Sequence, residues 1–146
     1  MKTKKVSFFE RNLNVYTFKE NLFLSRQAIR GEIGRLNGAC SDLENIPQIK
    51  LVSLGSFDQG LNLLTKNRLR GICGSHAAIY FVSQQLQIPI DHFKSVLVTK
   101  KMLSAHFHPN SSDKKIEKVR KAIQIIQKNG ALQKIRNKYH DSDIQN

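Results

Sequence analysis

The clearest hydrophobic pattern lies near the end of the chain, between residues 112 and 128. Apolar residues recur there every three or four positions, and lysine, glutamate, arginine and glutamine occupy most of the positions between them. The apolar residues are Ile116, Val119, Ile123 and Ile126. This spacing predicts an amphipathic α-helix that begins near Ser112. Asn129-Gly130 is expected to end it with a left-handed cap, and a second, shorter helix is expected to extend to Tyr139.

The preceding hundred or so residues alternate between short β-rich segments and helical ones. Extended chain or strands are expected at 6–25, 32–36, 49–54, 69–73, 93–99 and 103–107. Helices are expected from Cys40 or Ser41 to before Pro47, over 57–67 after the capping residue Ser56, and over 76–86. Because strands and helices alternate, the pattern predicts an α/β sheet with crossover connections rather than a helical bundle.

The composition is that of a folded protein with a strong positive charge. The 146 residues include 24 Lys+Arg and 11 Asp+Glu, which gives a net charge of +13, and 40% of them are hydrophobic. The length suits one domain or two small lobes, and the hydrophobic share argues against a disordered chain. Basic runs are no longer than pairs such as Lys4-Lys5 and Lys114-Lys115. Two interpretations stay open: a basic globular protein with solvated lysines, or a surface that binds nucleic-acid phosphates.

Several classes of protein are excluded by the sequence. No run of about 18 apolar residues is present, so no transmembrane helix is predicted. Met1 to Lys5 has the charge of the first part of a secretory signal, but Glu10 follows Phe8-Phe9 at once, so no apolar signal region is predicted. The two cysteines, Cys40 and Cys73, are too few for a disulfide scaffold or a zinc site made of cysteine alone.

Candidate catalytic and metal-binding groups are sparse. His106 and His108 lie on one side of a predicted strand, but a third metal ligand has no evident source. Cys40 at a helix start could be an activated nucleophile or simply a small buried thiol, and no local motif supports the nucleophile. The spacing of Gly71 and Gly74 lacks the lysine of a phosphate-binding loop. We therefore expect no catalysis, no metal and no cofactor.

Two predicted junctions between a strand and a helix have the features of an anion-binding site. They are Asn37 to Ser41 and Gly71 to Ser75. Backbone N–H groups at a helix start can hold an anionic group such as a carboxylate. In a parallel α/β sheet, both junctions would lie at the carboxyl ends of strands, where ligands bind. The alternative is that both are ordinary turns between a strand and a helix.

Three segments carry a family resemblance through their order and spacing. The first is Ile29 to Gly38, the second is Ser56 to Ser75, and the third runs from Asn110 to Tyr139. The most specific part of the third is Ile125-Ile126-Gln127-Lys128-Asn129-Gly130 followed by Ile135-Arg136-Asn137-Lys138-Tyr139. Together the sequence resembles the periplasmic solute-binding proteins of ABC importers, in the class that binds polar amino acids and has the type II periplasmic-binding-protein fold.

The resemblance implies a two-lobed α/β protein that binds its solute between the lobes. Residues 26–104 would form a complete second lobe, with a parallel-type sheet flanked by helices. Residues 1–25 would be the strands of the first lobe that approach the hinge. Residues 105–146 would return to the first lobe and supply its C-terminal helices. Most of that first lobe, including an arginine that pairs with the ligand carboxylate, would be missing from this chain.

The resemblance also implies a set of ligand-binding residues in the second lobe. These are Gly38, Ala39, Cys40, Ser41 and Ser75. The family has a hydroxyl residue where this chain has Ala39, and an acidic residue that holds the ligand amine near Ser75. The aspartate of another family motif falls on Arg70. Backbone donors of the site are therefore expected to remain, whereas two side-chain contacts to an amino acid are not.

The function implied by the resemblance is solute binding without catalysis. The chain would be a solute-binding protein, or a truncated remnant of one, in an ABC-type uptake system for amino acids or similar small polar solutes. Its partners would be the solute and the transporter permease, and its location the periplasm. The alternative from a different class is a small basic nucleic-acid-binding protein, which the spread of the charge disfavours.

Two structural consequences follow from the resemblance. Without a complete first lobe, the apolar faces of residues 6–25 and 112–128 would lose their partner, so self-association or partial disorder is expected. Cys40 and Cys73 would lie near the same binding site, and whether they form a disulfide in an oxidising compartment is left open by the sequence.

Overall fold

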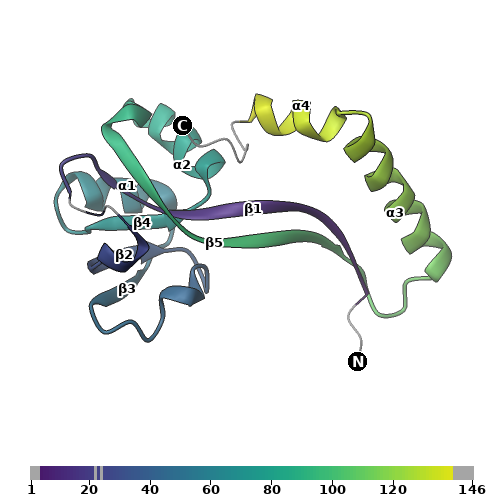
Figure 1. Ribbon diagram of the computed structural model, residues 1–146, viewed down its shortest axis with the longest axis horizontal. Coiled ribbons are helices and arrows are strands. Elements are labelled where there is room, and N and C mark those ends of the chain that lie inside the picture. Colours follow the sequence, from purple (N-terminus) through teal and green to yellow (C-terminus); the bar gives the residue numbers. More distant parts are fainter. Residues whose placement is uncertain (1–3, 22, 24, 140–146) are drawn as a thin grey trace. The chain divides into compact units, whose positions relative to one another are not determined.

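The computed structural model describes residues 4–21, 23 and 25–139, so the outermost parts of the predicted segments 1–25 and 105–146 lie outside the described residues. The chain divides into two compact units (Figure 1). Unit 1 contains residues 1–11 and 101–146, and unit 2 contains residues 12–100. Two long strands, β1 (Lys5–Phe18) and β5 (Phe93–His106), have residues in both units. The predicted lobe boundaries after residues 25 and 104 stay predictions.

The sheet combines three parallel strands with two long ones, in the order β3-β2-β4-β1-β5. β2 (Gly31–Arg35) pairs in parallel with both β3 (Ile49–Ser53) and β4 (Gly71–Gly74). β1 pairs antiparallel with β4. The predicted α/β class with a parallel-type sheet is confirmed for β2, β3 and β4, and β1 makes the whole sheet mixed.

The strand predicted at 93–99 and the one predicted at 103–107 are a single strand, β5. The exposed pair Lys100-Lys101 separates the two apolar stretches in the sequence. Proline and glycine are the residues that interrupt strands, and lysine does not, so the strand continues through this pair. β5 pairs with β1: the Lys19 N–H donates to the His92 carbonyl in unit 2, and the Phe107 N–H donates to the Lys4 carbonyl in unit 1.

Two α-helices of unit 2 begin at serine caps. α1 (Phe57–Thr65) starts after Ser56, whose Oγ accepts from the Gln59 N–H at 3.2 Å. α2 (His76–Gln85) starts after Ser75, whose Oγ accepts from the Ala78 N–H at 3.4 Å. A serine oxygen at this position satisfies one of the donors that the first turn leaves unpaired. Both helices were predicted at these places and are confirmed.

The helix predicted from Cys40 or Ser41 to before Pro47 is wrong. The structure has only a 3-10 turn there, η2 (Ser41–Leu43). Cys40 has a left-handed backbone with φ of 60°, and Asn45 has φ of 65°. A left-handed residue at each end of so short a segment prevents an α-helix from growing in either direction. Two further 3-10 turns, η1 (Arg26–Ala28) and η3 (Ile90–His92), connect strands of this unit.

The core of unit 2 lies on both faces of the sheet, as the alternation along β1 and β4 requires. Tyr16 and Ile72 pack with the apolar sides of α1 and α2, including Leu61 and Ile79. Their neighbours in the sequence, Val15 and Cys73, belong to a second cluster on the other face. That cluster also contains Phe23, Ile29, Ile33, Cys40, Leu43 and Val98.

Unit 1 is built from the outer parts of β1 and β5 and two further helices. α3 (Asp113–Lys128) begins after Ser112, whose Oγ accepts from the Lys115 N–H at 3.3 Å. Gly130, with φ of 81°, separates α3 from α4 (Ala131–Lys138), in agreement with the predicted left-handed cap. Among the described residues, no helix is long and apolar enough to cross a membrane.

The apolar face of α3 has a partner inside unit 1. Ile116 and Ile123 are buried in a small cluster with Val6, and Phe8, Ala105 and Phe107 pack against it. The expectation that residues 112–128 lose their apolar partner is therefore wrong for this side of the helix, because β1 and β5 cover it. Self-association of the chain stays a prediction.

Candidate functional site

The predicted site residues come together at one edge of the unit 2 sheet. β2 and β4 are parallel, so Gly38 to Ser41 and Ser75 follow strands that end at the same edge. A disulfide joins Cys40 to Cys73, and the Cα atoms of the two residues are 6.4 Å apart. The disulfide thus connects the loop after β2 to the last part of β4, directly before Ser75. This edge is called the carboxyl edge below.

The five predicted residues differ in their exposure and in whether their side chains are free to contact a ligand. Gly38 and Ser41 are exposed, and Ala39 is half-buried. Cys40 is only 1% exposed, and its sulfur is bonded to Cys73, so its side chain is neither an activated nucleophile nor a free thiol. Ser75 is buried and uses its hydroxyl to cap α2. Backbone groups therefore make up most of what these residues offer to a ligand.

Arg35, the last residue of β2, holds the loop that follows it. Its Nη1 atom donates to the Ala39 carbonyl at 3.2 Å and to the Glu44 Oε1 at 2.7 Å. The side chain of Arg35 is mostly buried, so its ion pair with Glu44 is less screened than a fully exposed pair. Together with the disulfide, Arg35 keeps the Gly38–Ser41 backbone in a fixed position at the carboxyl edge.

Asn14 is a residue of this edge that the sequence did not point to. It lies in β1 opposite Gly74 and is 0% exposed. Its Nδ2 donates to Ser95 Oγ at 3.5 Å, whereas its Oδ1 has no hydrogen-bond partner among the described residues. A buried carbonyl oxygen without a partner costs about 1–3 kcal/mol, and such atoms in native proteins call for a water, an ion or a ligand.

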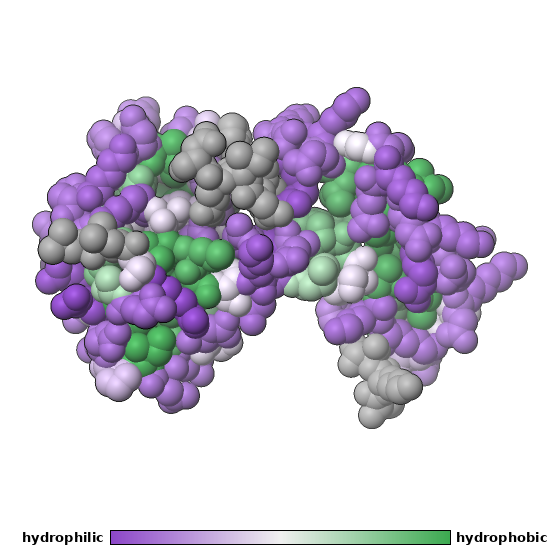
Figure 2. Space-filling view, viewed as in Figure 1, coloured by the Kyte–Doolittle hydropathy of each residue, from purple (hydrophilic) through white to green (hydrophobic). Residues whose placement is uncertain are grey.

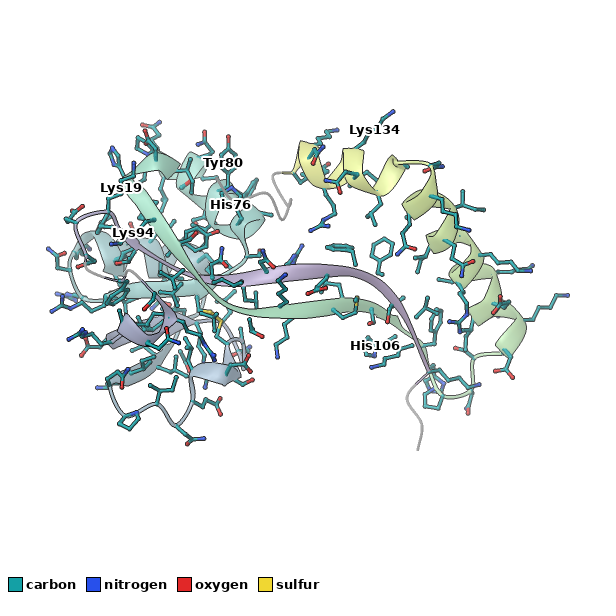
Figure 3. All side chains as sticks on the ribbon, viewed as in Figure 1. Lys19, His76, Tyr80, Lys94, His106 and Lys134 are labelled. Carbon is teal, nitrogen blue, oxygen red and sulfur yellow. A yellow bond between two sulfur atoms is a disulfide. The ribbon has the colours of Figure 1, made fainter. Side chains whose placement is uncertain are left out.

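Tyr16 and His76 form a second polar contact, between β1 and the start of α2, with Tyr16 opposite Ile72 in the sheet. The Tyr16 hydroxyl lies 3.1 Å from His76 Nδ1, which connects β1 to the first residue of α2. The rings of His76 and Tyr80 lie 6.0 Å apart, next to one another on α2 (Figure 3). Burial raises the pKa of Tyr16 to about 12, although side-chain hydrogen bonds from Asn14 and Ser95 act in the opposite direction. The phenol is therefore a neutral hydrogen-bonding group at physiological pH.

The raised pKa of Tyr16 predicts a loss of stability in strong base. The unfolded chain releases the phenol proton near the ordinary value of 10.0, and the folded chain releases it only near 12, so the folded state binds more protons between these values. The free energy of unfolding should therefore fall by about 2–3 kcal/mol over this range because of Tyr16. Urea unfolding of the wild type and Tyr16→Phe at both ends of the range measures this; an equal fall in the two proteins would disprove it.

The described residues offer no metal site of three or more His, Cys, Asp or Glu. His106 and His108 are both exposed, and His108 Nδ1 accepts a hydrogen bond from the Asn110 N–H at 3.1 Å. Both histidines belong to unit 1, and no third ligand for this pair is evident in the sequence.

A pocket in unit 2 lies away from the predicted residues. It has a volume of about 580 Å³ and includes Gly31, the first residue of β2, and Arg70, the residue before β4. These are the amino ends of the parallel strands, opposite the carboxyl edge. Glu20, Arg30 and Glu32 give the pocket charges of both signs. The rule that α/β sheets bind ligands at the carboxyl ends of their strands favours the other edge as the functional one.

No protein-family model and no curated protein sequence matches the chain. Solved structures do match it. The probable amino-acid ABC transporter extracellular-binding protein YtmK of Bacillus subtilis has a TM-score of 0.77 at 17% identity, over 98% of this chain and 65% of that one. The amino-acid ABC transporter substrate-binding protein AbpA of Streptococcus pneumoniae, bound to L-arginine, has a TM-score of 0.74 at 14% identity, over 98% and 63%.

Two further structures widen the range of similar proteins. The ligand-binding core of GluR0 in complex with L-glutamate has a TM-score of 0.75 at 12% identity, over 92% of this chain and 63% of that one. An ancestral amino-acid-binding protein, described as a precursor of cyclohexadienyl dehydratase, has a TM-score of 0.71 at 13% identity, over 94% and 61%. The similar proteins are thus mainly binding proteins, and one stands at the origin of an enzyme.

The chain spans about 60–65% of the length of the structures it matches, and nearly all of its own length is matched. At these identities the likeness concerns the fold. The chain therefore has the fold of amino-acid ABC transporter substrate-binding proteins, over part of their length.

Proposed function

We propose that the chain binds a small polar solute, similar to an amino acid, at the carboxyl edge of unit 2, without catalysing a reaction. The observation that carries the proposal is Asn14, whose buried Oδ1 atom lacks a partner beside the end of β4. The fold match supports the class of ligand, since similar structures hold L-arginine and L-glutamate.

The carboxyl edge offers donors for an anionic group. The first N–H groups of a helix have no partner within the helix, and the helix dipole favours negative charge there. Ser75 and the start of α2 supply such groups, and the backbone of Gly38, Cys40 and Ser41 lies on the neighbouring loop. The Ala39 N–H is not one of these donors, because it already donates to the Leu36 carbonyl at 2.9 Å. We assign the solute carboxylate to these backbone donors.

The edge also offers an acceptor for a cationic group. Asn14 Oδ1 is the acceptor without a partner, and a carbonyl oxygen accepts well from an ammonium group. The resembling family has an acidic residue near Ser75, where this chain has no carboxylate, so the amine would be held by a neutral carbonyl instead. A solute bound in this way should be held less tightly than one that forms an ion pair.

The disulfide supports a location outside the reducing cytoplasm. Structural disulfides form and persist in oxidising compartments such as the bacterial periplasm and the cell exterior. We therefore place the chain there, as a component of an ABC-type uptake system that delivers its solute to a permease. In this proposal residues 26–104 form the second lobe of the binding protein.

Replacing Asn14 tests the proposal. Isothermal titration calorimetry of the wild type against L-arginine, L-glutamate and the other common amino acids should identify at least one ligand. Asn14→Ala should then weaken that binding by about 10- to 100-fold, since a hydrogen bond to a charged group contributes about 1.5–3 kcal/mol. Asn62→Leu, at an exposed position of α1, is the matched control and should bind as the wild type does.

A thermal melt of each variant separates lost binding from lost folding. If no amino acid gives heat with the wild type, the proposed function is wrong, although the fold is unaffected. If Asn14→Ala binds as tightly as the wild type while remaining folded, the site lies elsewhere in the chain.

A further inference from the structure

The helices of unit 1 carry a positive charge that the proposed function does not use. Residues 113–138 contain nine lysine and arginine residues and two acidic ones. Both acidic residues are already paired: Asp113 Oδ1 lies 3.4 Å from Lys4 Nζ, and Glu117 Oε2 lies 3.1 Å from Arg120 Nε. Neither of these ion pairs therefore involves a lysine of the two helices.

Seven lysines of α3 and α4 are exposed and form no ion pair with another described residue. They are Lys114, Lys115, Lys118, Lys121, Lys128, Lys134 and Lys138. We call these seven side chains the lysine surface. Figure 2 shows that hydrophilic residues cover much of the visible face of unit 1, with hydrophobic residues among them.

Four lysines of the lysine surface lie on one face of α3. Lys114, Lys118, Lys121 and Lys128 follow one another at intervals of four, three and seven residues, which places them on one face of the helix. Ile116 and Ile123, which are buried against the strands, belong to the other side. The face with the lysines is thus the one that the core of unit 1 leaves to solvent.

Exposed apolar side chains lie within the lysine surface. Ile125 is 60% exposed and lies on the same face of α3 as Lys121 and Lys128, four residues after the first and three before the second. On α4, Ile135 is 53% exposed and lies between Lys134 and Lys138. Tyr139 follows them and is also exposed, with Lys138 Nζ lying 5.6 Å from its ring centre.

α4 is oriented by contacts on its other side. Arg136 donates from Nη2 to the Glu10 carbonyl at 3.2 Å, and its guanidinium lies 4.5 Å from the centre of the Phe9 ring. Both partners belong to β1, so this side of α4 faces the strand. Figure 3 shows the side chain of Lys134 extending away from the ribbon.

We infer that the lysine surface is a docking site for an anionic lipid bilayer. Helices that lie on a membrane have lysine or arginine near the lipid headgroups and apolar side chains that enter the boundary of the acyl chains. Here the lysines would contact the headgroups, and Ile125, Ile135 and Tyr139 would enter the boundary of the acyl chains. Nucleic acid would use the lysines alone and would leave the two isoleucines in water, so the combination favours the membrane.

Vesicle binding of the full chain tests this inference. The chain should sediment with vesicles that contain about 30% phosphatidylglycerol in phosphatidylcholine, and much less with phosphatidylcholine alone. Binding should weaken as salt is raised above about 0.1 M, because the lysine charges become screened. The triple variant Lys114→Gln, Lys118→Gln, Lys121→Gln should lose about 100-fold in partitioning.

A second triple variant separates this surface from net charge alone. Lys19, Lys50 and Lys66 are exposed residues of unit 2, and changing all three to glutamine removes the same charge. This control should lose less than about 10-fold, since its lysines lie outside the docking site. Ile125→Ser should lose about 3-fold or more, which screening of charge cannot explain.

Three outcomes would overturn the inference. Equal losses in the two triple variants would show that net charge drives binding without a particular surface. Unchanged partitioning of Ile125→Ser would remove the apolar contact that distinguishes a membrane. Tighter binding to duplex DNA than to the anionic vesicles at the same salt would assign the surface to nucleic acid. None of these outcomes bears on solute binding at the carboxyl edge.

Discussion

Removing the disulfide by the double substitution Cys40→Ser, Cys73→Ser should lower the free energy of unfolding by about 3–5 kcal/mol. The two cysteines are 33 residues apart, and the cross-link restricts that whole segment in the unfolded chain. The segment contains β3, α1 and most of β4, so the constraint acts on the central part of unit 2. Both residues are also fully buried, so each serine places a hydroxyl in an apolar cluster.

Urea unfolding followed by circular dichroism measures this effect. The wild type should unfold at a lower urea concentration when a reducing agent is present, and the double variant should not respond to the reducing agent. A wild-type midpoint that is the same with and without reductant would contradict the expected contribution of the disulfide.

Shortening Ile72 to alanine should cost about 3–5 kcal/mol, because it leaves a cavity beneath α1. Ile72 is 0% exposed and lies in β4, the middle strand of the sheet. Its Cδ1 atom comes so close to the backbone of α1 that a Cβ atom added to Gly60 would lie only 3.1 Å from it. The strand and the helix are thus closely packed at this side chain.

Two further variants make the cavity argument specific. Ile72→Val removes one methylene and should cost about 0.5–1.5 kcal/mol. Ile125→Ala changes an isoleucine that is 60% exposed and should alter the free energy of unfolding by less than about 0.5 kcal/mol. Urea denaturation should therefore rank Ile72→Ala far below the other two. A cost for Ile72→Ala as small as that for Ile125→Ala would show that Ile72 does not hold α1 to the sheet.

Helices and caps could be predicted from the sequence because their signals are local. The apolar spacing of α3, its start at Ser112 and the glycine at 130 all lie within a few residues of the structure they determine. Ser56 is a similar case, since its hydroxyl bonds to the backbone only three residues away. The resemblance to solute-binding proteins came from the same kind of local pattern, taken in order along the chain.

The features that sequence reasoning missed depend on residues far apart in the chain. The sequence predicts a helix start at Cys40 and leaves its pairing with Cys73 open, whereas the structure has a disulfide and a left-handed backbone at this residue. The antiparallel pairing of β1 with β4 cannot be read from either segment alone. Nothing in the sequence singles out Asn14, and only the folded structure shows that its oxygen is buried without a hydrogen-bond partner among the described residues.

The central claim is that a small amino-acid-like solute binds at the carboxyl edge of unit 2, and amide chemical-shift mapping by NMR tests it most directly. On addition of L-arginine, L-glutamate or another amino acid that binds, the largest shifts should occur at Gly38 to Ser41 and at Ser75 to Ala78. Asn14 should shift with them, while the start of β2 at Gly31 should not. Shifts centred on Gly31 and Arg70, or no shifts with any amino acid, would contradict the claim.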